Sequence, residues 1–141
     1  MSFWDSSAIV PLCTFESRSA AARRLWSARS QPVVWCESVV EIASAFARLR
    51  DQGTINAGAL SRAEKRLWHL ESIWIEISST PTVIGLAREL PGRYKLRAGD
   101  SLQLAAALVW SEGVQTREFV SADKKLIQAA EEAGFTTFDL S

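Results

Sequence analysis

Residues 118–138 read EFVSADKKLIQAAEEAGFTTF, and this stretch decides the fold class. The segment 118–121, with Phe119 and Val120 at its centre, is typical of a short buried strand, and residues 123–133 have the apolar spacing of an amphipathic helix. Gly134 ends that helix, and 136–138 predicts a second short strand. A strand, a helix and a strand in close succession predict two parallel strands in an α/β sheet.

The same alternation extends through the rest of the chain, without internal repeats or a linker. We expect further strands at 2–4, 32–35 and 73–77, helices at 6–12, 16–29, 38–50, 56–70, 81–90 and 100–112, and a loop at 93–97. The resulting architecture is a mostly parallel sheet of four to five strands with helices on both faces. With 141 residues, the chain is expected to form a single domain over 1–141.

Composition excludes several classes of protein. Sixteen basic residues balance sixteen acidic ones, so bulk positive charge cannot attract nucleic acid, and any such role must lie in a local patch. No apolar run approaches the ~20 residues of a membrane span, and the sequence starts without a signal peptide, so we expect a cytoplasmic protein. Two cysteines and one histidine provide neither a disulfide framework nor a zinc site.

Four carboxylates share a position at or just inside the start of a predicted helix: Asp5, Glu41, Asp100 and Asp123. Asp5 and Asp123 directly follow predicted strands, and ligands bind beyond the carboxyl ends of parallel strands. Acids without imidazole or thiolate partners favour Mg²⁺ or Mn²⁺. Convergence of the four would therefore form a divalent-cation site.

Helix capping is the competing explanation for these acids, because Asp is a common N-cap and the helix dipole favours an acid in the first turn. Residues 38–41 (SVVE) match a capping box, and 100–103 (DSLQ) form a variant of it. Capping explains each acid singly but does not require that they converge.

The sequence resembles PIN domains of the VapC toxin type over nearly its whole length. The resemblance lies in 3–8 (FWDSSA), 41–49 (EIASAFARL), 96–107 (LRAGDSLQLAAA) and 119–126 (FVSADKKL), followed by 129–130 (AA) and 134–135 (GF). It implies a PIN-like three-layer α/β/α fold and an endoribonuclease that depends on Mg²⁺ or Mn²⁺. It also implies an RNA substrate, a small antitoxin partner and a homodimer. The four acids stand where the family places its metal-binding carboxylates, so we expect Asp5, Glu41, Asp100 and Asp123 to be catalytic.

Other side chains are expected to support this chemistry. Ser6 and Ser121 lie next to or near the acids and are candidates to orient the carboxylates, with helix capping as the alternative. Five basic residues flank two of the acids and are candidates to bind the RNA backbone: Arg93, Lys95, Arg97, Lys124 and Lys125. The six tryptophans could stack on bases, but we expect them to pack in the core.

Three other functions remain open. A haloacid-dehalogenase-like phosphatase needs a second aspartate two residues after the first, where this chain has Ser7. A ribonuclease-H-like nuclease would begin with a long antiparallel hairpin, whereas helices begin here almost at once. A PIN-like scaffold that binds RNA or protein without catalysis would not need four acids.

Overall fold

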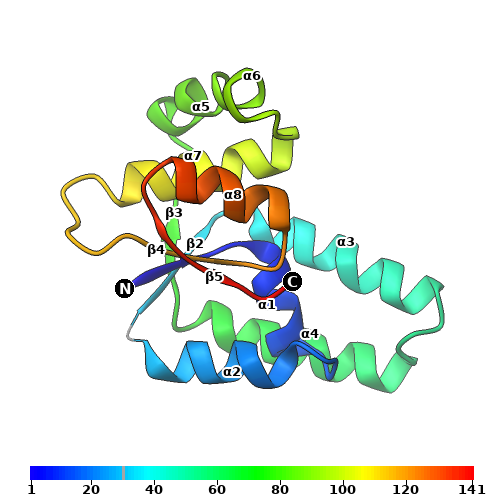
Figure 1. Ribbon diagram of the computed structural model, residues 1–141. Coiled ribbons are helices and arrows are strands. Elements are labelled where there is room, and N and C mark those ends of the chain that lie inside the picture. Colours follow the sequence, from blue (N-terminus) through cyan, green and yellow to red (C-terminus); the bar gives the residue numbers. More distant parts are fainter. Residues whose placement is uncertain (30) are drawn as a thin grey trace.

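The computed structural model describes residues 1–29 and 31–141 (Figure 1). Strands and helices alternate along most of the chain. Their order is β1 (Ser2–Trp4), α1 (Ser6–Cys13), α2 (Ser19–Ala28), β2 (Pro32–Trp35), α3 (Ser38–Asp51), α4 (Ala57–Glu71), β3 (Ile75–Ile77), α5 (Pro81–Ala87), α6 (Leu90–Tyr94), α7 (Ala98–Trp110), β4 (Glu118–Ser121), α8 (Lys124–Glu132) and β5 (Thr136–Asp139).

The five strands of the described residues form one sheet in the order β3-β2-β1-β4-β5. Every neighbouring pair is parallel, and Phe3 of β1 lies opposite Val33 on one side and Phe119 on the other. The chain moves to one side of β1 through β2 and β3, then returns to its other side with β4. This reversal between β1 and β4 creates the crevice at their carboxyl ends where ligands bind in open α/β sheets.

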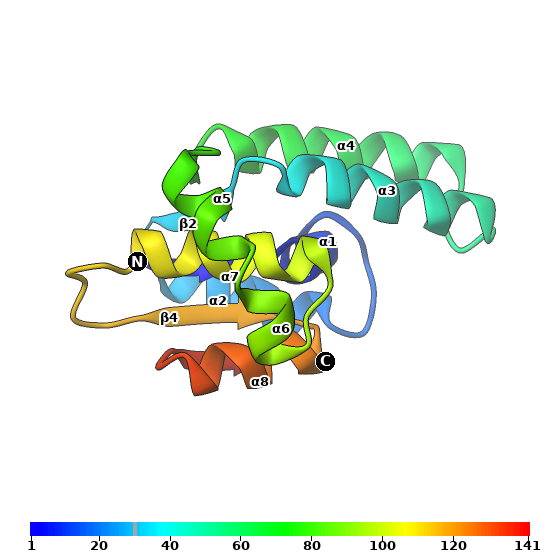
Figure 2. The same ribbon diagram turned by 90° about the horizontal axis from the view of Figure 1, so that it is seen from above.

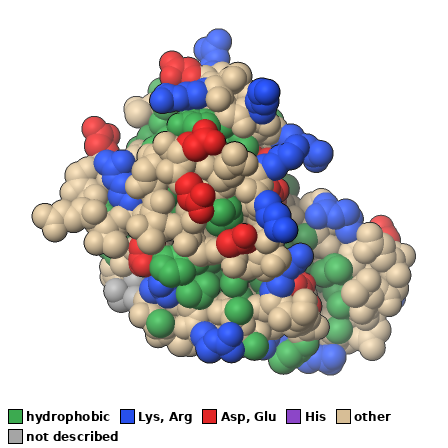
Figure 3. Space-filling model, in the orientation of Figure 1, with side chains coloured by type: hydrophobic (Ala, Val, Ile, Leu, Met, Phe, Trp, Pro, Cys, Tyr) green, Lys and Arg blue, Asp and Glu red, His purple; other side chains and the backbone are tan. Residues whose placement is uncertain are grey.

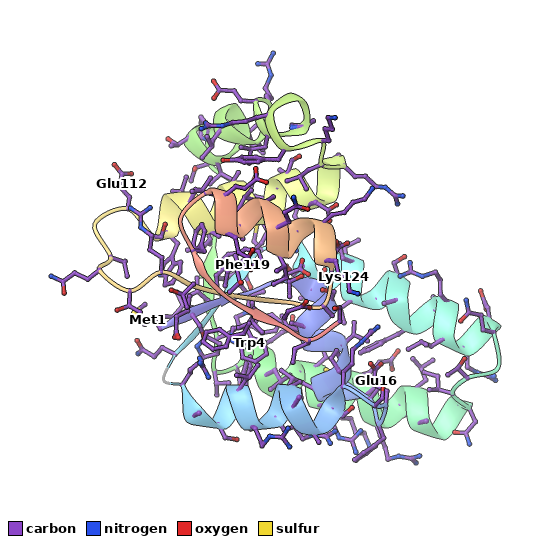
Figure 4. All side chains as sticks on the ribbon, in the orientation of Figure 1. Met1, Trp4, Glu16, Glu112, Phe119 and Lys124 are labelled. Atoms are coloured by element: carbon purple, nitrogen blue, oxygen red, sulfur yellow. The ribbon has the colours of Figure 1, made fainter. Side chains whose placement is uncertain are left out.

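Both faces of the sheet are covered, as predicted for strands with continuous apolar runs. Phe3 and Phe119 point to the layer that contains α5 to α8, and their rings stack at 5.4 Å. Trp4 and Val120, the next residues along these strands, point to the opposite layer with α1 to α4. Figure 4 shows Phe119 and Trp4 on opposite sides of the sheet. The three-layer α/β/α fold is confirmed.

Helices α3 and α4 lie side by side and extend beyond the sheet (Figures 1 and 2). Only the first part of α3 lies near the strands, where Ile42 and Phe46 pack into the core. The start of α3 also contacts α1, so it borders the crevice at the carboxyl ends of the strands. None of the helices in the described residues is both long and apolar enough to cross a membrane.

One predicted helix is divided in the structure. The helix expected at 81–90 ends at Ala87, and a separate short helix, α6, contains Pro91 and Arg93. Proline fits the first turn of a helix, where its missing N–H has no intrahelical acceptor. The left-handed conformation of Lys95, with φ of 55°, ends α6. The predicted loop therefore begins after Tyr94, and Arg93 is helical.

The prediction that tryptophans pack in the core is correct for most of them but wrong for Trp68. Trp4 and Trp35 are fully buried, and Trp74 is nearly so. Trp68 lies on α4 with 77% of its surface exposed. The helical pattern of 56–70 did not reveal this, because Trp68 adjoins Leu67, which packs against the core, and apolar periodicity places a face only approximately.

Candidate active site

Asp5 is held at the point where β1 ends and α1 begins. Its backbone N–H donates to the carbonyl of Val120 in β4, at 3.0 Å. Its carboxylate caps α1 by accepting from the backbone N–H of Ser7, at 3.2 Å. Only 3% of the residue is exposed. The position of this acid is therefore fixed by the sheet and by the helix together.

Three hydroxyl groups orient the carboxylate of Asp5. Ser121 Oγ donates to Asp5 Oδ2 at 2.9 Å, and Ser7 Oγ donates to the same oxygen. Ser6 Oγ lies 3.5 Å from Asp5 Oδ1 and 3.2 Å from Glu41 Oε2, so it links two of the acids. The sequence singled out Ser6 and Ser121 but missed Ser7, which also accepts from the backbone N–H of Ala122. Its place two residues after a capping aspartate was the available signal.

Glu41 lies in the first turn of α3 and is held by Gln103, a residue that was not predicted from the sequence. Gln103 Nε2 donates to Glu41 Oε1 at 2.9 Å and to Ser38 Oγ at 2.8 Å. Ser38 is the first residue of α3, after the N-cap Glu37, and no side chain caps this helix. The capping box expected at 38–41 is therefore absent, since Ser38 accepts from another helix instead.

The other two acids come from the starts of α7 and α8. Helix α7 begins at Ala98, so Asp100 lies in its first turn and does not cap it. Asp123 caps α8, with Oδ1 accepting from the backbone N–H groups of Lys125 at 2.8 Å and Leu126 at 3.1 Å. Capping thus accounts for Asp5 and Asp123 but not for Glu41 or Asp100.

The four acids line a single cleft of about 390 Å³. Its other walls come from α1 and α3 and contain Ser6, Ser7, Val10, Val40, Ser44, Ala45 and Arg48. Glu41, Ser44, Ala45 and Arg48 follow the helical spacing that places them on one face of α3. Ser44 and Arg48 were not predicted from the sequence, and Arg48 donates to Ser44 Oγ at 3.0 Å.

In the described residues, none of these acids forms an ion pair within 4.0 Å, although the charge of Arg97 acts on Asp100. Burial raises the pKa of Asp5 to about 6, and the charge of Glu41 adds to this, against hydrogen bonds from Ser7 and Ser121 that lower it. Burial also raises the pKa of Asp100, as do the charges of Asp123 and Glu41, whereas the charge and the backbone of Arg97 lower it. In the described residues, the ion pairs within 4.0 Å join Arg18 to Glu16 and Arg29 to Glu118. No such pair involves the four acids.

The donor chemistry of the cleft fits a hard divalent cation, because all four groups present carboxylate oxygens. The raised pKa values of Asp5 and Asp100 also fit, since a bound cation would offset the cost of burying their charges and the weaker repulsion from neighbouring acids. Within the described part of the chain, no three His, Cys, Asp or Glu side chains are already arranged closely enough to hold a metal ion. The four acids would have to move closer together around a bound ion.

Basic side chains border the acids on the side of α6 to α8. A hollow beside the cleft is lined by Lys95, Arg97, Lys124 and Lys125 together with Asp100 and Asp123. Arg93 lies farther away, in a neighbouring hollow that it shares with Lys95 and Lys125, and its guanidinium packs on Tyr94. Figure 3 shows basic side chains gathered on the right of this face, and Figure 4 places Lys124 at the start of α8.

The fold has close counterparts among solved structures. No protein-family model matches the sequence, and no curated protein matches it. A toxin-antitoxin complex from Klebsiella pneumoniae contains a chain with a TM-score of 0.67 and 15% identity, over 100% of this chain and 98% of that one. The sarcin-ricin loop cleaving toxin VapC20 of Mycobacterium tuberculosis has a TM-score of 0.67 and 18% sequence identity, over 96% of this chain and 97% of that one.

FitAcB from Neisseria gonorrhoeae gives a TM-score of 0.67 and 14% identity, over 99% of this chain and 98% of that one. This chain has the PIN-like fold of the VapC-type toxins. Each match extends over nearly the full length of both chains, so the PIN-like fold accounts for every layer described above.

Proposed function

We propose that this protein is a divalent-metal-dependent endoribonuclease that acts as the toxin of a type II toxin-antitoxin pair. The observation that carries the proposal is the convergence of four carboxylates on one cleft of a PIN-like fold, with no ion-pair partner among the described residues. Asp5, Glu41, Asp100 and Asp123 would hold Mg²⁺ or Mn²⁺. The bound cation would activate water and neutralise charge that develops on an RNA phosphodiester.

Each acid would contribute according to its surroundings. Asp5 is the most buried and has the most hydroxyl donors, so its carboxylate has the least freedom to move. Ser6 links Asp5 to Glu41 and would hold these two carboxylates at a fixed position relative to each other. Asp123 uses Oδ1 to cap α8, which leaves Oδ2 as its oxygen for a cation or a water molecule. No protein nucleophile is required.

Positive side chains on two sides of the acids support an RNA substrate. Arg48 lies on the α3 wall of the cleft, and Lys95, Arg97, Lys124 and Lys125 line the hollow on the opposite side of Asp100 and Asp123. A phosphate backbone that crosses the acids would meet cations before and after the scissile bond. Arg93 would contribute at longer range, through the hollow next to Lys95.

A small antitoxin and a second copy of the chain are the proposed protein partners. One structural neighbour is a toxin-antitoxin complex, which supports the first. Exposed apolar side chains support the presence of a protein partner that would cover them. Val40 borders the acidic cleft with 67% of its surface exposed, and Trp68 is 77% exposed. A partner segment over Val40 would also block access of RNA to the acids. This function belongs in the cytoplasm, where RNA substrate and antitoxin would meet.

RNA cleavage by the purified protein tests the proposal. We expect cleavage with Mg²⁺ or Mn²⁺, none with EDTA, and none for Asp5→Asn or Asp100→Asn. Asp51→Asn is the matched control, because Asp51 is an exposed carboxylate at the far end of α3 and should leave cleavage unchanged. Cleavage that persists in EDTA or in the Asp100→Asn variant would refute the mechanism.

Two further outcomes separate the toxin from the alternatives. Growth arrest by the wild type but not by Asp100→Asn would support the toxin role. RNA binding without cleavage would favour the non-catalytic scaffold. A phosphatase is disfavoured because Ser7, at the position where that class has its second aspartate, donates its hydroxyl to Asp5.

A further inference from the structure

Gln103 is a fully buried polar residue on α7 that contacts Glu41 but does not line the acidic cleft. Its relative exposure is 0%, and its two amide hydrogens are used by Ser38 Oγ and Glu41 Oε1 of α3. Its own Oε1 is buried and has no hydrogen-bond partner in the described residues. A buried acceptor without a partner destabilises the fold, so an apolar side chain would serve packing better at this position.

The direction of the amide follows from the chemistry of its neighbours. Glu41 is a carboxylate that only accepts hydrogen bonds, so the NH₂ group of Gln103 must face it. The opposite orientation would bring two acceptor oxygens together. The unpartnered Oε1 is therefore a consequence of directing the donor towards Glu41.

The contact fixes one oxygen of Glu41 and leaves the other towards the cleft. Gln103 occupies Oε1, whereas Oε2 lies 3.2 Å from Ser6 Oγ, on the side of Asp5. The neutral amide of Gln103 holds the carboxylate and leaves its negative charge uncompensated. A lysine or arginine at this position would neutralise that charge. Ser38, one turn before Glu41, ties the same amide to the start of α3.

We propose that Gln103 is a positioning residue that holds Glu41 in the orientation in which it binds a divalent cation. The inference rests on the proposed metal-dependent function, and it assigns to α7 a second contribution besides Asp100. Removing the amide would free Glu41 to rotate away from the cleft and would weaken cation binding before it affects the fold.

Calorimetric titration of metal-free protein with Mn²⁺, together with the melting temperature in EDTA, tests this inference. Gln103→Met keeps the length of the side chain but has no donor, and we expect its Kd for Mn²⁺ to rise about 10- to 100-fold, the usual cost of losing a group that supports a ligand. Its melting temperature in EDTA should change little, because the unpartnered acceptor is removed as well.

Ala105→Gly is the control, since it loosens the same buried helix without touching Glu41. It should lower the melting temperature and leave the Kd for Mn²⁺ at the wild-type value. If Gln103→Met does not fold, Gln103→Asn retains an amide on a side chain too short for both contacts, and the same rise in Kd is expected.

The outcomes are distinct. If the wild type and Gln103→Met bind Mn²⁺ with the same Kd, the proposed role of Gln103 is wrong, whereas the proposed metal-dependent function stands. Wild-type protein that does not bind Mn²⁺ overturns the proposed function and this inference together. A rise in Kd for Gln103→Met but not for Ala105→Gly supports the inference.

Discussion

Ser121 Oγ lies 2.9 Å from Asp5 Oδ2, although 116 positions separate the two residues in the chain. The bond joins the end of β4 to the end of β1, and Ser121 Oγ also accepts from the backbone N–H of Asp123 at 3.0 Å. One hydroxyl therefore sets the distance between the turns that carry two of the four acids. The parallel pairing of β1 and β4 brings these turns together.

Substitution of Ser121 tests this arrangement. Ser121→Ala removes a donor from Asp5, and we expect RNA cleavage to fall about 10- to 100-fold at a fixed Mg²⁺ concentration. The control is Ser111→Ala, because Ser111 is equally buried but donates to the carbonyl of Leu108, away from the cleft. Equal losses in the two variants would show that only general stability is affected.

Asp5 should make the stability of the metal-free protein fall with rising pH. Its pKa in the folded state is about 6, above the usual 3.8, so the folded protein holds this proton more tightly than the unfolded chain does. The contribution of Asp5 to the free energy of unfolding is then fully present below pH 3.8 and is lost as the pH rises through 6. The difference between the two pKa values of Asp5 corresponds to a change of about 3 kcal/mol in the free energy of unfolding.

Asp5→Asn keeps a capping side chain without the charge, so it isolates this effect. In EDTA, urea unfolding should show the variant to be more stable than the wild type above pH 6, with a difference that shrinks towards pH 4. Asp51→Asn, which alters an exposed carboxylate, should show no such trend. A wild type that gains stability relative to Asp5→Asn as the pH rises would contradict the assignment.

The sequence predicted the strands, most helices and the positions of the four acids at helix starts, because each depends on a short-range pattern. Strands such as 32–35 are short apolar runs, and Asp5 and Asp123 are recognisable from the strands that they follow. Gln103 was missed because its contacts with Ser38 and Glu41 join segments that are distant in sequence, whereas Ser7 had a local signal in its place two residues after Asp5. The break between α5 and α6 was missed because Pro91 fits a helix start as well as a turn.

Divalent cations should reverse the unfavourable effect of the Asp100 charge in the metal-free protein. Asp100→Asn removes a charge that is partly buried and lies near Asp123 and Glu41, so we expect a higher melting temperature than the wild type in EDTA at pH 7.5. In millimolar Mn²⁺ the order should invert, because only the wild type gains the stabilisation that accompanies ligand binding. Thermal unfolding with and without Mn²⁺ checks both parts. A variant that stays more stable than the wild type in Mn²⁺ would exclude Asp100 as a ligand.

Arg48 should bind RNA rather than take part in the chemistry. It lines the acidic cleft, whereas Arg50 lies two positions later on the same helix and outside the cleft lining. Both side chains are exposed, so Arg48→Glu and Arg50→Glu change the net charge equally in similar surroundings. Arg48→Glu should raise the KM for RNA and reduce the dependence of log Kd on log salt by about 1, the value for one lost phosphate contact. Arg50→Glu should leave both close to wild type. The two variants differ only in the side of α3 on which the charge is reversed. Equal effects would therefore mean that RNA binding depends on the overall charge of the protein and not on a contact with Arg48.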